Sequence, residues 1–184
     1  SAVWDFRIWL PRMAWALGGA HALSGRASEA VPLLEQAVGR AMSPAMTIRH
    51  IVPLAWLAEA YVLVGRTDEA ATLASRCAGL AHDHTEHGHE AWTLRLLGEI
   101  ALTGERALLP EEAENYFRRA LALAGERGMR PLVAHCHVGL AVAHKRKGAL
   151  DAARSHLHVA QTLFSETGMR WWSAEAEAKL AGLP

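Results

Sequence analysis

The chain has 184 residues, of which 51% are hydrophobic, and its 19 basic residues balance 19 acidic ones. This length suits a single domain, and a formal charge of zero excludes the long-range attraction that draws proteins to nucleic acid or to anionic membranes. Ala and Leu dominate the apolar residues while β-branched residues are scattered, which predicts an all-α fold.

The first ten residues, SAVWDFRIWL, are strongly apolar and carry only two charges. They lack the basic start and the cleavage site of a signal peptide, and the sequence has no run of about 18 apolar residues that could cross a membrane. We therefore expect a cytoplasmic protein. We also expect residues 1–10 to end an element that precedes the repeats in a longer chain, and to support a homodimer, because unfinished ends of helical stacks tend to associate.

Apolar residues spaced by three and four positions predict nine helices. In chain order these cover residues 11–24, 27–42, 47–64, 67–82, 89–103, 110–127, 130–147, 149–167 and 171–182. A small residue recurs in the first helix of each pair with steps of 40, 40 and 43 residues, at Gly18, Ala58, Gly98 and Ala141. The second helices repeat in the same way, with Ala30, Ala70, Ala113 and Ala153. The longer step reflects a three-residue insertion in GERALLP, and a fixed period in this range indicates stacked helix pairs.

We predict a right-handed α-α superhelix of about four helical hairpins plus a capping helix, in one domain over residues 1–184. The repeats are expected at 11–46, 47–88, 89–129 and 130–168, with the capping helix at 171–182. Glycines are expected to end the helices, with Gly25, Gly65 and Gly148 after first helices and Gly88, Gly128 and Gly168 after second helices. Cys77 and Cys136 lie in apolar helical patterns without metal-ligand spacing, which predicts small core residues.

Two repeats carry a motif of paired leucines and a small residue, followed by spaced Ala and aromatic or small residues. Its members are Leu54, Leu57, Ala58, Tyr61, Ala70, Ala74 and Cys77, then Leu94, Leu97, Gly98, Ala101, Ala113, Phe117 and Ala120. The motif resembles the tetratricopeptide repeat (TPR) signature, with a period longer than the usual ~34 residues.

Longer strings, among them HEAWTLRLLGEIAL and GMRWWSAEAEAKL, resemble the C-terminal repeat region of large bacterial signalling proteins. In that family a class III adenylate or guanylate cyclase domain is followed by a STAND-type ATPase domain and then by such repeats. The resemblance implies a regulatory, partner-sensing arm. It carries over no catalytic residue.

In TPR stacks the first helices line a concave groove, so equivalent positions in each repeat give the expected lining. The candidates for partner binding are Arg12, Trp15, Val52, Glu59, Trp92, Arg95, Glu99, His135 and Lys145, and Val138 and Val142 share this face. Trp15 and Trp92 are of the residue type that anchors a bound partner, and the alternative is that they pack between neighbouring repeats. Glu59 and Glu99 occupy equivalent positions and could together bind a cationic group of a partner. The alternative is that both are solvated acids that pair with Arg95. Acids at these positions disfavour a peptide's terminal carboxylate, and Lys145 near a helix end suits the helix dipole.

Eight of the eleven histidines fall in H-x-H pairs. The loop run HDHTEHGHE offers weak candidates for a zinc or nickel site, His82, His84, His87 and His89. No Cys joins them, so we expect a solvated polar loop and no physiological metal. His144 and His156 are expected to face each other as a surface pair across the last hairpin.

Phosphate-binding loops, nucleophile elbows and the H-E-x-x-H zinc motif are absent from the sequence. We therefore expect no enzyme activity and no cofactor. The predicted function is a non-catalytic interaction and regulatory module of a larger bacterial signalling protein. It would bind a protein or peptide partner, or another domain of its parent, in the groove, and neither nucleic acid nor membrane. The alternative is a small-molecule effector sensor of a STAND-type regulator, which a deep apolar pocket near Trp15 and Trp92 would favour.

Overall fold

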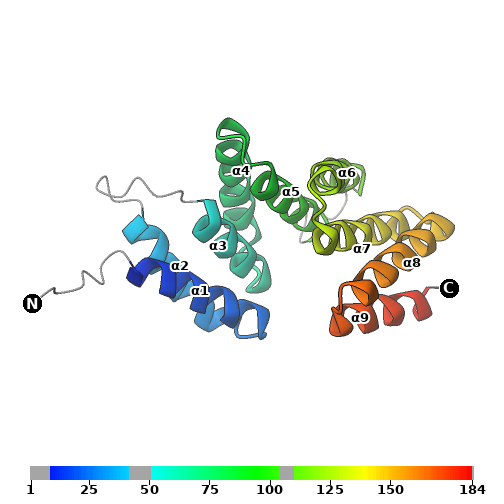
Figure 1. Ribbon diagram of the computed structural model, residues 1–184, viewed down its shortest axis with the longest axis horizontal. Helices are drawn as coiled ribbons and strands as arrows, with labels where there is room; N and C mark the ends of the chain where they lie inside the picture. The colour runs from blue at the N-terminus through cyan, green and yellow to red at the C-terminus, as the bar shows by residue number, and fades with distance from the viewer. Residues whose placement is uncertain (1–8, 42–50, 104–109, 184) are drawn as a thin grey trace, which may run out of the picture. The chain divides into compact units, whose positions relative to one another are not determined.

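The computed structural model describes residues 9–41, 51–103 and 110–183, and every regular element within these ranges is an α-helix (Figure 1). The helices are α1 (Trp9–Leu23), α2 (Ala27–Ala41), α3 (Ile51–Leu63), α4 (Thr67–Asp83), α5 (His87–Ala101), α6 (Pro110–Glu126), α7 (Arg130–Arg146), α8 (Leu150–Glu166) and α9 (Arg170–Ala181). This confirms the all-α prediction. The predicted start of the third helix and the apolar residues 1–8 lie outside the described ranges. None of the described helices is long and apolar enough to cross a membrane.

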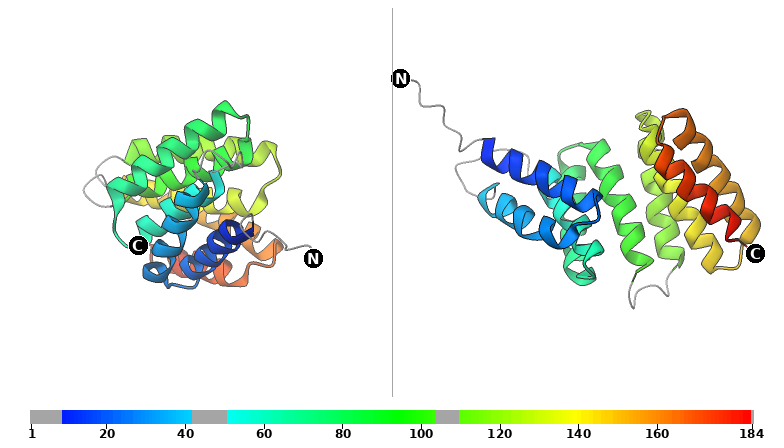
Figure 2. Two further views of the ribbon diagram at one scale, coloured as in Figure 1. Left: turned by 90° about the vertical axis from the view of Figure 1, so that its left-hand side faces the viewer. Right: turned by 90° about the horizontal axis from the view of Figure 1, so that it is seen from below.

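The chain forms two compact units, residues 1–80 and 81–184, which are described separately. In the first unit α1 packs against α2, and α2 packs against α3. In the second unit α5 to α9 pack in sequence, and α7, α8 and α9 lie side by side (Figure 2). The first helix of one pair also contacts the first helix of the next, α1 with α3 and α5 with α7. Each unit is thus a series of helical hairpins with its first helices in a row, while the single domain over residues 1–184 stays a prediction.

Small residues let the paired helices approach closely, as the repeat predicts. A β-carbon at Gly18 of α1 would lie 2.5 Å from Cγ of Leu34 on α2, and one at Gly98 of α5 would lie 2.8 Å from the Phe117 ring on α6. The repeated alanines of the second helices are fully buried at Ala30, Ala70, Ala113 and Ala153. Larger side chains at these close-packed positions would force the helices apart.

First and second helices of the second unit bury different shares of their surface. Each second helix buries one stripe of residues spaced by three or four positions, with Ala113, Phe117, Ala120 and Ala124 in α6 and Ala153, Leu157, Ala160 and Phe164 in α8. This spacing is typical of a helix with one side in solvent. α5 and α7 bury residues around most of their circumference, because other helices cover them on several sides.

Both cysteines are core residues, as predicted. Cys77 and Cys136 are fully buried, and burial raises the pKa of each thiol to about 12. Because the thiolate is the reactive form, these side chains are inert at neutral pH. The Cys77 Sγ donates a weak hydrogen bond to the carbonyl oxygen of Ile51 at 3.9 Å.

The turns between helices repeat one geometry in which a residue with positive φ is followed by a backbone bond reaching back five positions. Gly25, Gly65, Gly128, Gly148 and Gly168 have positive φ, and five of the six predicted turn glycines are therefore confirmed. Gly88 is a correction, because it lies inside α5. Its place is taken by Thr85 (φ 55°), and Glu86 N–H donates to the Ala81 carbonyl at 2.8 Å. The three-residue insertion before α6 explains this shift, since the prediction assumed an unbroken 40-residue step.

Thr85→Gly is expected to stabilise the protein by about 1 kcal/mol. A β-branched residue at positive φ costs about 1–2 kcal/mol, and glycine removes this cost while adding some chain entropy to the unfolded state. Urea unfolding followed by far-UV circular dichroism measures the change. The matched control is Thr72→Gly inside α4, which should destabilise by about 0.5 kcal/mol. Equal effects of both substitutions would contradict a strained Thr85.

Candidate functional site

The first helices of each unit carry the residues predicted to bind a partner. In the first unit Trp15 on α1 and Val52 and Glu59 on α3 are half-buried. In the second unit Trp92 on α5 is half-buried as well. The side chain of Arg12 lies outside those described. Partial exposure suits either an anchoring or a packing tryptophan, so both interpretations of Trp15 and Trp92 stand.

Arg95 and Glu99 form an ion pair along α5. Arg95 is 7% exposed, and its guanidinium donates to Oε1 of Glu99, one turn further along the helix. Pairs at this spacing stabilise a helix and offset each other's charge. The structure therefore favours the interpretation in which Glu99 is engaged by Arg95.

The half-buried His135 takes part in the packing of α7 against α8 and α9, and its assignment as a groove residue stays a prediction. Its ring lies edge-on to Phe164 at 5.0 Å and to Trp172 at 4.5 Å between centroids. Burial, with a smaller effect from the Arg95 charge, lowers the pKa of His135 to about 4. The imidazole is neutral at pH 7 and acts as a packing ring. Trp172 of α9 also stacks on Phe164 of α8, with 6.1 Å between the ring centroids.

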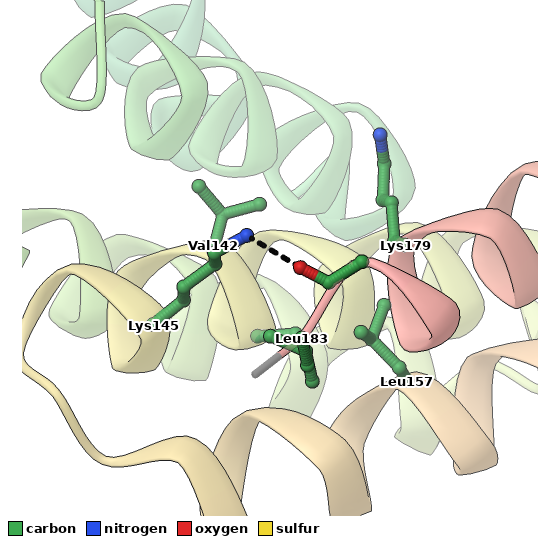
Figure 3. A pocket seen from close by; sticks show the side chains of 7 residues that line it. Val142, Lys145, Leu157, Lys179 and Leu183 are labelled. Carbon is green, nitrogen blue, oxygen red and sulfur yellow. Dashed lines mark hydrogen bonds between the residues drawn. The ribbon is translucent and has the colours of Figure 1, made fainter.

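Lys145 lines a pocket between α7 and α9, with α8 beneath it (Figure 3). The pocket has a volume of about 260 Å³. Its lining consists of Ala141, Val142 and Lys145 from α7, Leu157 from α8, and Lys179, Gly182 and Leu183 from the end of α9. Val142 and Lys145 are two of the predicted face residues of the fourth repeat, so their side of α7 borders a real hollow.

The pocket combines an apolar base with two cationic side chains. Leu157 and Leu183 at the base belong to the core cluster between α7, α8 and the end of α9. Lys145 Nζ donates to the Gly182 carbonyl oxygen at 3.4 Å, and Lys179 Nζ lies 3.8 Å from a carboxylate oxygen of Glu175. Both interactions are long and solvent-exposed, which makes them weak. The sequence pattern had indicated a groove position and a dipole role for Lys145 and had not drawn attention to Lys179.

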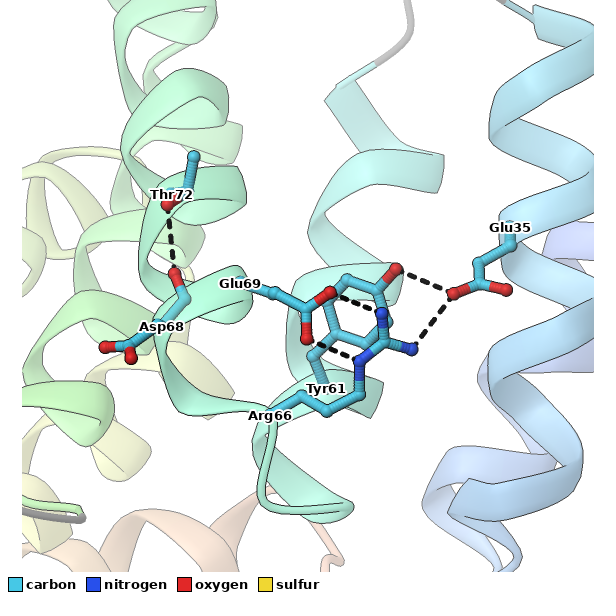
Figure 4. A network of polar contacts seen from close by, with 6 residues as sticks. All are labelled: Glu35, Tyr61, Arg66, Asp68, Glu69 and Thr72. Atoms are coloured by element: carbon cyan, nitrogen blue, oxygen red, sulfur yellow. Dashed lines mark hydrogen bonds and ion pairs between the residues drawn. The ribbon is translucent and has the colours of Figure 1, made fainter.

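A polar network in the first unit joins three helices (Figure 4). The Tyr61 hydroxyl donates to Oε1 of Glu35 at 2.8 Å, and Arg66 donates to the same oxygen at 3.0 Å. Arg66 also binds both carboxylate oxygens of Glu69 and lies 4.0 Å from the centre of the Tyr61 ring. Burial and the Glu35 hydrogen bond raise the pKa of the Tyr61 hydroxyl. The network links α2, α3 and α4 through bidentate and cation–π contacts, a structural role that sequence reasoning missed.

The histidine-rich loop pairs its histidines with carboxylates. His82 Nδ1 lies 3.2 Å and His87 Nδ1 lies 3.6 Å from oxygens of the buried Glu90. His89 Nδ1 lies 2.7 Å from Glu86, while the His84 side chain is exposed. Across the described ranges, no group of three or more His, Cys, Asp or Glu side chains is arranged to hold a metal ion. The weak metal candidates therefore gain no support from the geometry.

Three histidines meet between α7 and α8. The rings of His144 and His156 stack at 5.3 Å with 8° between their planes, which confirms that they face each other. His137 Nδ1 lies 2.8 Å from His156 Nδ1, a contact that the sequence analysis did not predict. Burial, together with the opposing ring, lowers the pKa of His137 to about 4. The signal for this cluster was the seven-residue spacing of His137 and His144, which places both on one face of α7.

Comparison with known proteins identifies the repeat type. No family model and no curated protein matches the sequence. Among solved structures, aspartyl phosphate phosphatase F from Bacillus subtilis matches with a TM-score of 0.75 at 17% identity, over 93% of this chain and 44% of that one. A kinesin-light-chain protein from Podosopora anserina with nearly identical TPR-like repeats matches with a TM-score of 0.63 at 19% identity, over 92% of each chain. BtubC (BKLC) from P. vanneervenii matches with a TM-score of 0.62 at 16% identity, over 95% of this chain and 87% of that one.

At these identities the likeness shows the fold, and the chain is built of TPR-like repeats. This confirms the TPR part of the predicted resemblance. The chain spans less than half the length of the phosphatase that it matches. The three matched proteins give no link to cyclase and STAND ATPase proteins, so that finer resemblance stays a prediction.

Proposed function

We propose that this TPR-like chain is a non-catalytic interaction module that binds a segment of a protein partner along its first helices. In this proposal it serves as a regulatory arm of a larger bacterial signalling protein. The observation that carries it is the direct contact of α5 with α7, by which the first helices of two successive repeats of the second unit lie side by side. Half-buried apolar side chains, Trp92, Val138 and Val142, lie on these two helices.

The division between first and second helices supports the same surface. α6 and α8 carry one buried stripe and a solvent-facing polar side, which is typical of an outer layer. Partly exposed aromatic and aliphatic groups on the other layer are the kind of residue that anchors a partner. The ion pairs Arg66–Glu35 and His82–Glu90 link neighbouring helices, and the other pairs are local to one helix or turn. We assign all of them a role in the fold and none in catalysis.

A second function, small-molecule sensing, is favoured by one observation, the 260 Å³ pocket between α7 and α9. It lies at a different place from the pocket predicted near Trp15 and Trp92. A sensor and a partner-binding arm are compatible in one chain, because the pocket occupies only the last repeat.

Site-directed photo-crosslinking in cells of the source organism tests partner binding. A photoreactive phenylalanine analogue at Val138 on α7 probes the first-helix row, and the same group at the exposed Val159 on α8 is the matched control. We expect a discrete crosslinked partner from position 138 at a yield at least about tenfold above that from position 159, since interface contacts concentrate on one patch. Substituting Trp92→Ala should reduce that crosslink. Equal crosslinking from both positions would contradict the proposal.

A further inference from the structure

We infer that the pocket between α7 and α9 is a binding site for a medium-chain aliphatic carboxylate. The inference rests on the second proposed function, small-molecule sensing at this pocket, and deepens it by naming the chemical class of the ligand. The inference rests on the size of the hollow, on its apolar base and on the sign of the charges that line it.

The size of the pocket limits the ligand. A volume of about 260 Å³ holds roughly nine water-sized groups at ~30 Å³ each. This accommodates a carboxylate with an alkyl chain of about six to eight carbons and is below the usual size of pockets for nucleotides or drug-sized molecules. The base of the hollow is formed by Leu157 and Leu183, which are 3% and 9% exposed and continue into the core. An alkyl chain placed there would lose contact with water on the side facing this core.

The charges of the pocket select an anion. Both ionisable residues in its lining are lysines, and among the residues that the structure describes no carboxylate belongs to the lining. An ammonium group has three donors. The bond from Lys145 to the Gly182 carbonyl uses one of them, and Glu175 offers Lys179 only a long, exposed contact. Both cations therefore retain donors for a carboxylate, which forms charge-assisted hydrogen bonds with such groups.

The plain alternative is that the two lysines only offset the partial negative charge at the helix ends. Lys145 is in the last turn of α7, and Lys179 is in the last turn of α9. On that view the lysines would affect stability and leave ligand affinity unchanged. The two views thus predict different results for the same pair of substitutions.

Titration of the full chain with sodium octanoate, followed by amide chemical shifts, tests the inference. We expect shifts centred on Val142, Leu157 and Leu183. Octanol, which has the same chain without the charge, and butanoate, which has the charge without the chain, should each bind at least about tenfold more weakly. The variant Lys145→Met with Lys179→Met should lose at least about tenfold in octanoate affinity, whereas Lys145→Arg with Lys179→Arg should stay within about threefold.

Circular dichroism confirms that both variants are folded before affinities are compared. Equal binding of octanol and octanoate, unchanged affinity of the methionine variant, or shifts centred outside the last repeat would each overturn the inference. An N-acetylated Leu-Asp methylamide tests whether the pocket instead binds a peptide that carries a carboxylate beside an apolar side chain. Tighter binding of this peptide than of octanoate would overturn the assignment of an aliphatic carboxylate as the ligand. Photo-crosslinking at Val138 is read independently, so failure of this inference is distinguishable from failure of the proposed partner binding.

Discussion

Phe117→Ala is expected to lower the free energy of unfolding by about 3–5 kcal/mol, the range for removing a fully buried aromatic ring. The Phe117 ring is completely buried and packs with Leu140 and with small residues of α5, α6 and α7. It lies against Gly98 on one first helix and Gly139 on the next, so it fixes the distance between three helices. Because domains are stable by only ~5–15 kcal/mol, this loss is a large share of the total. Urea unfolding should show a midpoint lower by about 2 M.

A double-mutant cycle with Gly139→Ala checks that the ring and the glycine form one packing unit. A methyl group at residue 139 would collide with the Phe117 ring, so Gly139→Ala alone should destabilise by about 1–3 kcal/mol despite the better helix propensity of alanine. In a Phe117→Leu background the penalty should shrink, because the shorter side chain leaves room. Additive effects of the two substitutions would contradict this packing.

Acidification from pH 7 to pH 5 is expected to destabilise the protein by about 2 kcal/mol through His135 alone. Its pKa is about 4 in the folded protein, below its ordinary value of 6.5, because the neutral ring is buried against Phe164 and Trp172. The unfolded chain therefore binds more protons between pH 6.5 and pH 4. The stabilising effect of the neutral ring is fully present above pH 6.5 and is lost as the pH falls toward 4. The lowered pKa of His137 acts in the same direction.

Comparison of the parent with His135→Phe isolates this effect. Other titrating groups change equally in both proteins, so the difference in unfolding free energy between pH 7 and pH 5 should be about 2 kcal/mol smaller in the variant. His158→Gln, at an exposed position of α8, serves as the control and should keep the parent's pH dependence. An identical pH dependence of all three proteins would show that folding does not change the pKa of His135, which would contradict the lowered value.

The helices and their small contact residues could be predicted because both depend on local spacing. Gly18 and Gly98 lie where a helix must approach its partner, and the 40-residue recurrence indicates this without a structure. The error at Gly88 has a local cause too. The insertion lies between residue 88 and Gly128, so counting back 40 residues from Gly128 missed the turn by three positions. The turn lies at Thr85, where the residue type gives no signal for positive φ.

The candidate site could be predicted only in part. The first-helix face was found by counting positions, and it contains Val142 and Lys145 of the pocket. The same counting placed His135 on that face, and it gave no indication that the His135 ring also packs against Phe164 and Trp172. Helix periodicity predicts only approximately on which face of a helix a side chain lies. The position of the neighbouring helix decides whether that face is buried in the core or exposed to solvent.

The sequence by itself determined the all-α class, the hairpin repeat and the TPR-like character, because a regular helix converts residue spacing directly into a buried stripe. Only the tertiary structure decided which distant residues meet. Lys145 and Gly182 are 37 positions apart, and Glu35 and Arg66 are 31 apart. Such contacts depend on how helices cross and on which rotamers the packing leaves open, and neither property is encoded in the spacing of residues along one helix.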